Sequence, residues 1–386
     1  MSKLLGYLAK DRGIVLFIAL ELAAFLVFFL NPSYPIVVYV TSALFGFYLI
    51  YKFPSSFFFS RKFLLLLVIA VPFLLVPVLT ANPDYEAVHT YRSLFDTLDQ
   101  GKNPYTCDNI YHRVDNEVVY GNFNYPPLEI PFYWLANLFL GSWNVWYMIL
   151  MNFLVRFLIC FLFMKTTPDL RHIQRLPFYL IFLLWGSEYP LTMTFLIVAL
   201  LMYFLVKKTS VEKKGTPIRY VPFLFVLGLL TKFFMIPIFF AFYYFYFFDL
   251  GKRKKTVVHL ALIALVGALL LLPFGIFNVL DSTALFNLNL SQRGAYTTFY
   301  PNVVSIFFDW MGSWLIYAFF GVGAFFSSLY FFDDSLLKKI VYACMVFMIF
   351  MPTPEPQFLP ILFYIVVVSK YSEFYDRVPR FSLPDG

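Results

Sequence analysis

Long apolar stretches recur along this chain, separated by short polar segments. A helix needs roughly 20 residues to cross about 30 Å of hydrocarbon, and fewer when neighbouring helices surround it. None of the stretches alternates polar and apolar positions as the strands of a membrane barrel do. The pattern therefore predicts an all-α polytopic membrane protein with about 11 to 13 transmembrane helices. The predicted spans are 14–30, 34–51, 63–80, 143–164, 176–187, 190–206, 219–233, 234–249, 256–275, 312–332, 339–351 and 357–369.

Two pairs of short spans leave their geometry open. Residues 176–206 and 219–249 each predict one long helix or a kinked hairpin, because Pro177, Pro190, Pro222 and Pro237 interrupt them. The first apolar run lacks a small-residue cleavage pattern, so we expect a retained transmembrane helix rather than a signal peptide.

Composition excludes a water-soluble domain. Hydrophobic residues make up 61% of the 386 positions and charged residues 13%, against about 45–50% and 25% in soluble domains. The three cysteines, Cys107, Cys160 and Cys344, show no spacing typical of a metal site or a disulfide framework. We therefore expect no metal and no cofactor from these residues.

The basic residues predict the orientation of the chain. With a cytoplasmic N-terminus, 23 of the 29 lysines and arginines fall on the inner side, as the positive-inside rule requires. Both termini are then cytoplasmic, and the net charge of +7 is an orientation signal that calls for no nucleic-acid partner. We expect the plasma membrane in a prokaryote and the endoplasmic reticulum in a eukaryote.

Two long loops are predicted on the outer side, at residues 80–142 and 277–311. Long loops in a compact membrane domain are usually functional, so we expect the chemistry on the extracytoplasmic face. Of the 22 acidic residues, 12 fall on this side: Asp84, Glu86, Asp96, Asp99, Asp108, Asp115, Glu117, Glu129, Glu188, Asp281, Asp309 and Glu355.

The first outer loop begins with a helical pattern. Five apolar residues share one face at helical spacing, Val88, Tyr91, Leu94, Phe95 and Leu98, which predicts an amphipathic helix suited to the bilayer surface. We expect the helix to stop near Gly101 and a turn to follow at 103–105. A second interfacial helix is predicted at 127–140, with two prolines in its first turn.

Asp84 stands where the third span leaves the membrane. A carboxylate held there can act as a general base for an incoming hydroxyl. It can also serve simply as a helix N-cap, and the sequence leaves both roles open.

The order of several short motifs carries a resemblance to a known family. After Asp84 come Gly101-Lys102-Asn103-Pro104-Tyr105 and Asn124-Tyr125-Pro126-Pro127-Leu128, which resemble the first lumenal loop of GT-C glycosyltransferases. Further segments are similar to those of the mannosyltransferase that adds the first mannose of GPI anchors and of bacterial lipid-linked mannosyltransferases. They are Thr231-Lys232-Phe233-Phe234, Ser291-Gln292-Arg293, Tyr300-Pro301-Asn302-Val303-Val304-Ser305 and Pro354-Glu355-Pro356-Gln357-Phe358.

The resemblance, over residues 63–370, implies a single GT-C-like domain spanning 1–386. It implies an inverting mannosyltransferase that moves a sugar from a polyprenol-phosphate donor, such as dolichyl-phosphate mannose, to a lipid or glycan acceptor at the bilayer. Asp84 is then the catalytic base, and Arg293 and Lys232 are expected to bind the donor phosphate. The remaining candidates for substrate binding are Tyr85, His89, Tyr105, Tyr125, Glu188, Gln292, Tyr300, Glu355 and Gln357.

Each candidate has an alternative interpretation. Arg293 can pair with an outer acid such as Asp309, Lys232 can extend its amine to the interface, and the tyrosines can anchor the interface. Glu188 and Glu355 are also typical of polar turns, and His89 and His112 are interpreted as hydrogen-bonding groups without metal-ligand spacing.

The chain departs from the family in two places. Asn82 stands where the GPI family has a second acid, and residues 1–62 carry two extra N-terminal spans; a divalent metal stays compatible with the family resemblance. Alternative functions are a transporter or flippase of lipid-linked sugars and a noncatalytic glycosyltransferase subunit. Few charged residues fall within the predicted spans beyond Glu21, Arg156 and Lys232, which disfavours transport.

Overall fold

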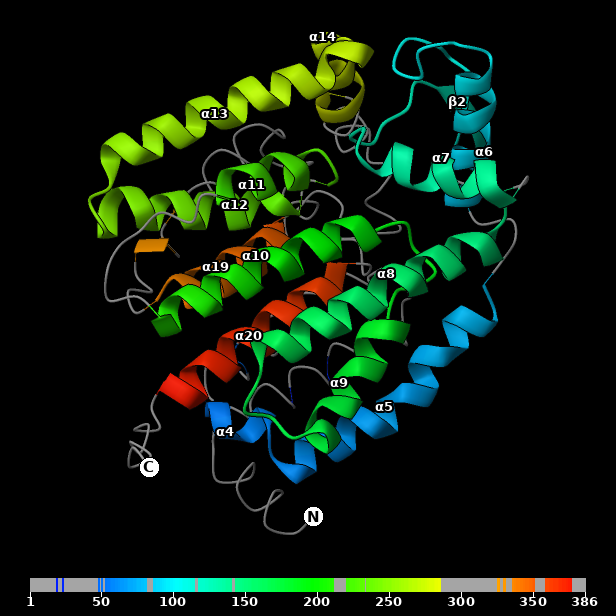
Figure 1. The fold of residues 1–386 in the computed structure, drawn as a ribbon. Coiled ribbons are helices and arrows are strands. Elements are labelled where there is room, and N and C mark those ends of the chain that lie inside the picture. Colours follow the sequence, from blue (N-terminus) through cyan, green and yellow to red (C-terminus); the bar gives the residue numbers. More distant parts are fainter. Residues whose placement is uncertain are drawn as a thin grey trace. The chain divides into compact units, whose positions relative to one another are not determined.

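In the computed structural model the chain divides into two compact units. The larger unit comprises residues 55–287, 334–341 and 356–386, and most of the helices labelled in Figure 1 belong to it. The structure describes residues 19, 23, 48, 50, 53–81, 86–114, 117–140, 143–211, 220–232, 234–285, 325–326, 329–330, 335–350 and 358–376. These residues are mostly helical.

Three of the described helices are long and apolar enough to cross a membrane. They are α5 (Arg61–Leu79), α8 (Val145–Thr166) and the run of α13 (Arg253–Leu271) and η2 (Leu272–Phe274). Most of the apolar surface of α5 and α13 is exposed in the protein, as expected for helices that face lipid. These helices coincide with the predicted spans 63–80, 143–164 and 256–275. Most of each of the predicted spans 14–30, 34–51 and 312–332 lies outside the described residues.

Shorter helices fill the rest of the unit. Their bounds are α4 (Ser55–Phe58), α9 (His172–Leu184), α10 (Thr192–Val211), α11 (Val221–Leu229), α12 (Met235–Tyr244), η1 (Phe245–Asp249), α14 (Ile276–Leu280), η3 (Asp281–Leu285) and α20 (Leu359–Asp376); α19 (Leu336–Phe350) contributes residues to both units. α10 packs against both α8 and α20, and all three are labelled in Figure 1.

The two pairs of short spans fold as separate helices. α9 and α10 are joined by a turn in which Gly186 has a φ of +70°, a backbone conformation that favours glycine. α11 and α12 are likewise separate, with Pro222 in the first turn of α11. Pro177 and Pro237 lie inside α9 and α12.

The segment predicted to form the first outer loop, here still called the first outer loop, folds onto its own helices. α6 (Glu86–Asp99) and α7 (Glu129–Leu140) flank an antiparallel hairpin of β1 (Ile110–Val114) and β2 (Glu117–Gly121). The Thr90 hydroxyl donates to the carbonyl of Tyr111 at 2.8 Å, and the Tyr111 amide donates to the Ser93 hydroxyl at 2.9 Å. The hairpin is therefore attached to α6 at two points.

The predicted amphipathic helix is confirmed, but its surroundings differ from those expected. Val88, Tyr91, Leu94 and Phe95 are buried in a core shared with α7 and the start of α8, so the apolar face of α6 packs on protein rather than on a bilayer. The rings of Phe95 and Trp143 pack edge to face, with their centroids 5.2 Å apart. α6 ends at Asp99, and Gly101 follows with a φ of +70°, as the sequence predicts.

Unlike α6, α7 has large apolar side chains that are exposed. Leu135, Leu138 and Phe139 are exposed on it, which suits a helix at the edge of the hydrocarbon. The helix begins at Glu129, so Pro126 and Pro127 precede its first turn instead of forming it.

Candidate functional site

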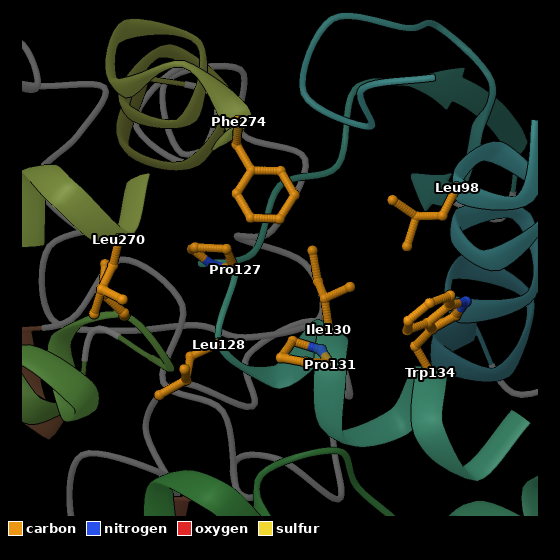
Figure 2. Close-up of a pocket in the computed structure, with 9 residues that line it drawn as sticks. Leu98, Pro127, Leu128, Ile130, Pro131, Trp134, Leu270 and Phe274 are labelled. Atoms are coloured by element: carbon orange, nitrogen blue, oxygen red, sulfur yellow. The ribbon is translucent and has the colours of Figure 1, made fainter. Parts of the chain in front are cut away.

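An apolar cavity of about 440 Å³ lies beside the first turns of α7. Figure 2 shows its lining side chains converging from several elements. Leu98 comes from α6, Leu270 and Phe274 from the end of α13 and from η2, and Leu230 follows α11. The remaining residues belong to α7 and the segment before it: Pro127, Leu128, Ile130, Pro131 and Trp134.

Hydrogen bonds between segments far apart in the sequence hold the cavity walls. The amide of Leu128 donates to the carbonyl of Leu230 at 2.9 Å. The side-chain amide of Asn103 donates to the carbonyl of Phe274 at 2.7 Å. The first outer loop is thus fixed to the ends of α11 and α13, and the cavity forms where these three segments meet.

Glu129 is a buried acid between two cavity-lining residues, Leu128 and Ile130. Its side chain is 0% exposed, and its Oε1 accepts from the Thr194 hydroxyl at 3.4 Å. Its Oε2 has no hydrogen-bond partner among the described residues. Burial raises the pKa of Glu129 to about 8, although the charge of Lys232 and the hydrogen bonds from Thr194 act in the opposite direction.

Lys232 lies in the turn between α11 and α12, two residues after the cavity-lining Leu230. Only 4% of it is exposed, and its Nζ lies 3.3 Å from the centre of the Tyr125 ring. The Tyr105 hydroxyl donates to the carbonyl of Tyr125 at 2.8 Å and so fixes the backbone beneath that ring. Lys232 is therefore held inside the protein against an aromatic face.

A chain of polar side chains continues from α7 into α8. The Tyr133 hydroxyl donates to Asn152 Oδ1 at 2.7 Å, and Asn152 Nδ2 donates to the carbonyls of Ser187 and Tyr189 at 2.8 and 2.9 Å. Arg156, one turn further along α8, donates to the carbonyls of residues 182, 185 and 186 at 2.6–3.0 Å. These bonds satisfy the carbonyls at the C-terminal end of α9, which no helical amide reaches.

No protein-family model, curated protein or solved structure matches the chain. Among the residues the structure describes, no group of three or more His, Cys, Asp or Glu is placed to hold a metal ion.

The structure brings Lys232 and Tyr125 together, as a shared site requires. Tyr105 is 1% exposed, and its ring packs on Phe274 at 5.4 Å, so its place is within the core beneath Tyr125. His89 lies on α6 with its ring 5.1 Å from Tyr111. Asp84, Tyr85, Gln292, Arg293, Tyr300, Glu355 and Gln357 lie outside the described residues, and their roles stay predictions.

Glu188 lies in the turn between α9 and α10 and is half-buried. Burial raises the pKa of its carboxyl, while the nearby Arg156 lowers it. One carboxyl oxygen is buried without a hydrogen-bond partner among the described residues. The turn position agrees with the sequence pattern, which left a turn role and an acceptor role open.

Sequence reasoning missed Glu129 as a member of the site. The sequence shows it only as one of twelve outer acids, directly before an apolar stretch. Its partner Thr194 is 65 positions away, and no local pattern links the two. The available signal was a lone acid after Pro126-Pro127 at the start of an otherwise uncharged helix, Glu129–Leu140.

Proposed function

We propose that the chain is a membrane glycosyltransferase of the GT-C type. It moves a sugar, mannose by resemblance, from a polyprenol-phosphate donor to a lipid or glycan acceptor on the extracytoplasmic side. The observation that carries this proposal is an apolar cavity whose lining includes Leu128, Ile130 and Leu230. These are close chain neighbours of two buried charge-bearing residues, Glu129 and Lys232. An apolar cavity together with a cation such as Lys232 suits an amphiphile with an anionic head group.

The lining favours a hydrocarbon chain over a free sugar. All nine lining residues are aliphatic, aromatic or proline, so a polar sugar would lose hydration there without gaining hydrogen bonds. An ammonium group such as that of Lys232 is a common binder of phosphate oxygens. A polyprenol-phosphate sugar combines these two chemistries in one molecule.

In the proposed reaction Asp84 takes the proton of the acceptor hydroxyl as its oxygen attacks the anomeric carbon. The bond between that carbon and the phosphate oxygen breaks, and the lipid phosphate leaves with the bonding electrons. Attack from the face opposite the phosphate inverts the anomeric configuration. Lys232 and Arg293 offset the charge that develops on the leaving phosphate.

The test is sugar transfer by the purified full-length protein with polyprenol-phosphate mannose. Asp84→Asn is expected to abolish transfer and to leave donor binding and folding largely intact. The matched control is Asp96→Asn, because Asp96 is exposed on α6, and this variant is expected to keep full activity. Robust transfer by Asp84→Asn would remove the carboxylate from the role of base.

A transporter or flippase of lipid-linked sugars is the second candidate. The observation that favours it is the buried polar chain of Tyr133, Asn152 and Arg156, since charged groups inside a membrane helix often mark a transport path. Movement of a labelled lipid-linked sugar across vesicles that contain the protein, without sugar transfer, would favour this candidate. A protein that neither transfers nor moves the lipid fits a noncatalytic subunit.

A further inference from the structure

The carboxyl of Glu129 is poorly supported as an anion. It is fully buried, and its described hydrogen-bond donors all belong to Thr194, whose hydroxyl donates to Oε1 at 3.4 Å, while Oε2 has no partner among the described residues. Buried carboxylates usually require several donors or a close ion pair to stay charged. Here the surroundings favour the neutral acid, which needs less solvation.

The groups around Glu129 come from four elements. Tyr91 on α6 and Tyr133 on α7 interact with it electrostatically, Thr194 on α10 donates to it, and Lys232 follows α11. Burial raises the pKa of both tyrosines well above 10, so they stay neutral where Glu129 titrates. Among these described neighbours, Glu129 is therefore the acid that changes charge near neutral pH.

We propose that Glu129 sets the charge of the ligand that the cavity accepts. As a neutral acid it admits a phosphate head group, and as a carboxylate it repels one. This inference deepens the proposed function and rests on it, because it takes a lipid phosphate as the ligand. Ionisation puts a full negative charge on the one residue that separates Leu128 from Ile130 in the chain, and both of those residues line the cavity.

The effect of this charge is large enough to measure. Two charges in a partly buried site interact strongly even at separations near 10 Å, so the affinity for an anion is expected to fall at least about tenfold when Glu129 ionises. An uncharged amphiphile of the same chain length feels no such change. The comparison therefore separates ligand charge from cavity shape.

The experiment measures binding to the full-length protein in a neutral detergent between about pH 6 and pH 9.5. The probes are farnesyl phosphate mannose, a phosphodiester that keeps one negative charge over this range, and the uncharged alcohol farnesol. In the wild type, affinity for the phosphodiester is expected to fall about tenfold with a midpoint near pH 8, and affinity for farnesol to stay constant. Glu129→Gln keeps the low-pH affinity throughout, and Asp99→Asn, a change at the exposed end of α6, keeps the wild-type profile.

Infrared spectroscopy reports the protonation of Glu129 without any ligand. A band from a buried carboxylic acid is expected at low pH in the wild type, is lost with the same midpoint, and is absent in Glu129→Gln. An unchanged pH profile in Glu129→Gln, an equal loss of farnesol binding, or a missing band overturns the inference. If sugar transfer is observed together with any of these results, the inference about Glu129 fails and the proposed function stands. If the phosphodiester does not bind at any pH, the inference and the proposed function are both overturned.

Discussion

The Nζ atom of Lys232 lies 3.3 Å from the centre of the Tyr125 ring. The two residues belong to different parts of the chain, the turn after α11 and the end of the first outer loop. The same two segments are also joined by a hydrogen bond from the Leu128 amide to the carbonyl of Leu230. The outer loop and the α11–α12 turn therefore form one continuous wall of the candidate site.

The ring of Tyr125 is predicted to stabilise the buried ammonium. A desolvated cation–π contact contributes about 2 kcal/mol, so Tyr125→Leu is expected to lower the free energy of unfolding by about 2 kcal/mol. Tyr125→Phe keeps an aromatic face, so its free energy of unfolding is expected to fall by much less. Thermal unfolding in detergent measures both variants.

The matched control for this prediction is Tyr120→Leu. Tyr120 lies on β2 with 62% of its surface exposed, so the same change there is expected to have little effect. Equal losses at positions 125 and 120 would show that the contact with Lys232 adds no stability.

The hydrophobic pattern was enough to predict the long apolar helices and α6. Their periods are local properties of the sequence, and burial of Val88, Tyr91 and Leu94 follows directly from helical spacing. The pattern does not say what covers an apolar face. For α6 the cover is the core around Phe123, Tyr133 and Trp143, contributed by segments that follow it in the chain.

The hairpin and the buried acid were not predicted from the sequence, for different reasons. β1 and β2 flank Asp115-Asn116, a turn-forming pair between runs containing Ile110, Val118 and Val119, so a hairpin signal was present but weak beside the apolar stretches. Glu129 meets Thr194 and Lys232 only in the folded chain. Tertiary packing decides which acid is buried, and the spacing of residues in the sequence does not predict it.

Stability is predicted to depend on the protonation of Glu129. Its pKa rises from an ordinary value of 4.5 to about 8 in the folded protein, so between these values the folded state holds a proton that the unfolded state has lost. Stability from this group is then fully present below about pH 4.5 and is lost as the pH rises toward 8. Each unit of pKa difference corresponds to about 1.4 kcal/mol.

The measurement is the free energy of unfolding of the wild type and of Glu129→Gln across this range. Subtracting the two curves removes the contribution of the other acids. We expect the stability of the wild type relative to Glu129→Gln to fall as the pH rises and to level off above about pH 8. Parallel curves would mean that the carboxyl ionises as readily inside the protein as outside.

Arg156 is predicted to be essential for the end of α9. It is 2% exposed and donates to the carbonyls of Phe182, Trp185 and Gly186. Arg156→Met removes this donor and leaves the carbonyls of Phe182 and Trp185 unsatisfied, whereas that of Gly186 still accepts from the Tyr189 amide at 3.3 Å. Each buried unsatisfied group costs about 1–3 kcal/mol, so a loss of at least about 2 kcal/mol is expected. The stability of Arg156→Lys is expected to lie between that of the wild type and that of Arg156→Met, because a single ammonium cannot match the planar donors of arginine.

The same helix offers a matched control. Lys165, in the last turn of α8, is exposed, so Lys165→Met removes a positive charge without uncovering a carbonyl. Thermal unfolding of the three variants separates charge from hydrogen bonding. A large loss in Lys165→Met would indicate that net charge, and not the α9 carbonyls, governs stability here.

Filling the cavity is predicted to weaken binding of a lipid donor without unfolding the protein. Leu270 lines the cavity and is 41% exposed, so Leu270→Trp can place its larger ring in the cavity without overpacking a closed core. The affinity for farnesyl phosphate mannose is expected to fall about tenfold, which corresponds to about 1.4 kcal/mol. Leu269→Trp is the control, since Leu269 is 55% exposed on the same helix and is not among the residues that line the cavity. Because the two variants add the same side chain at adjacent positions, equal affinities would show that the lipid chain binds elsewhere.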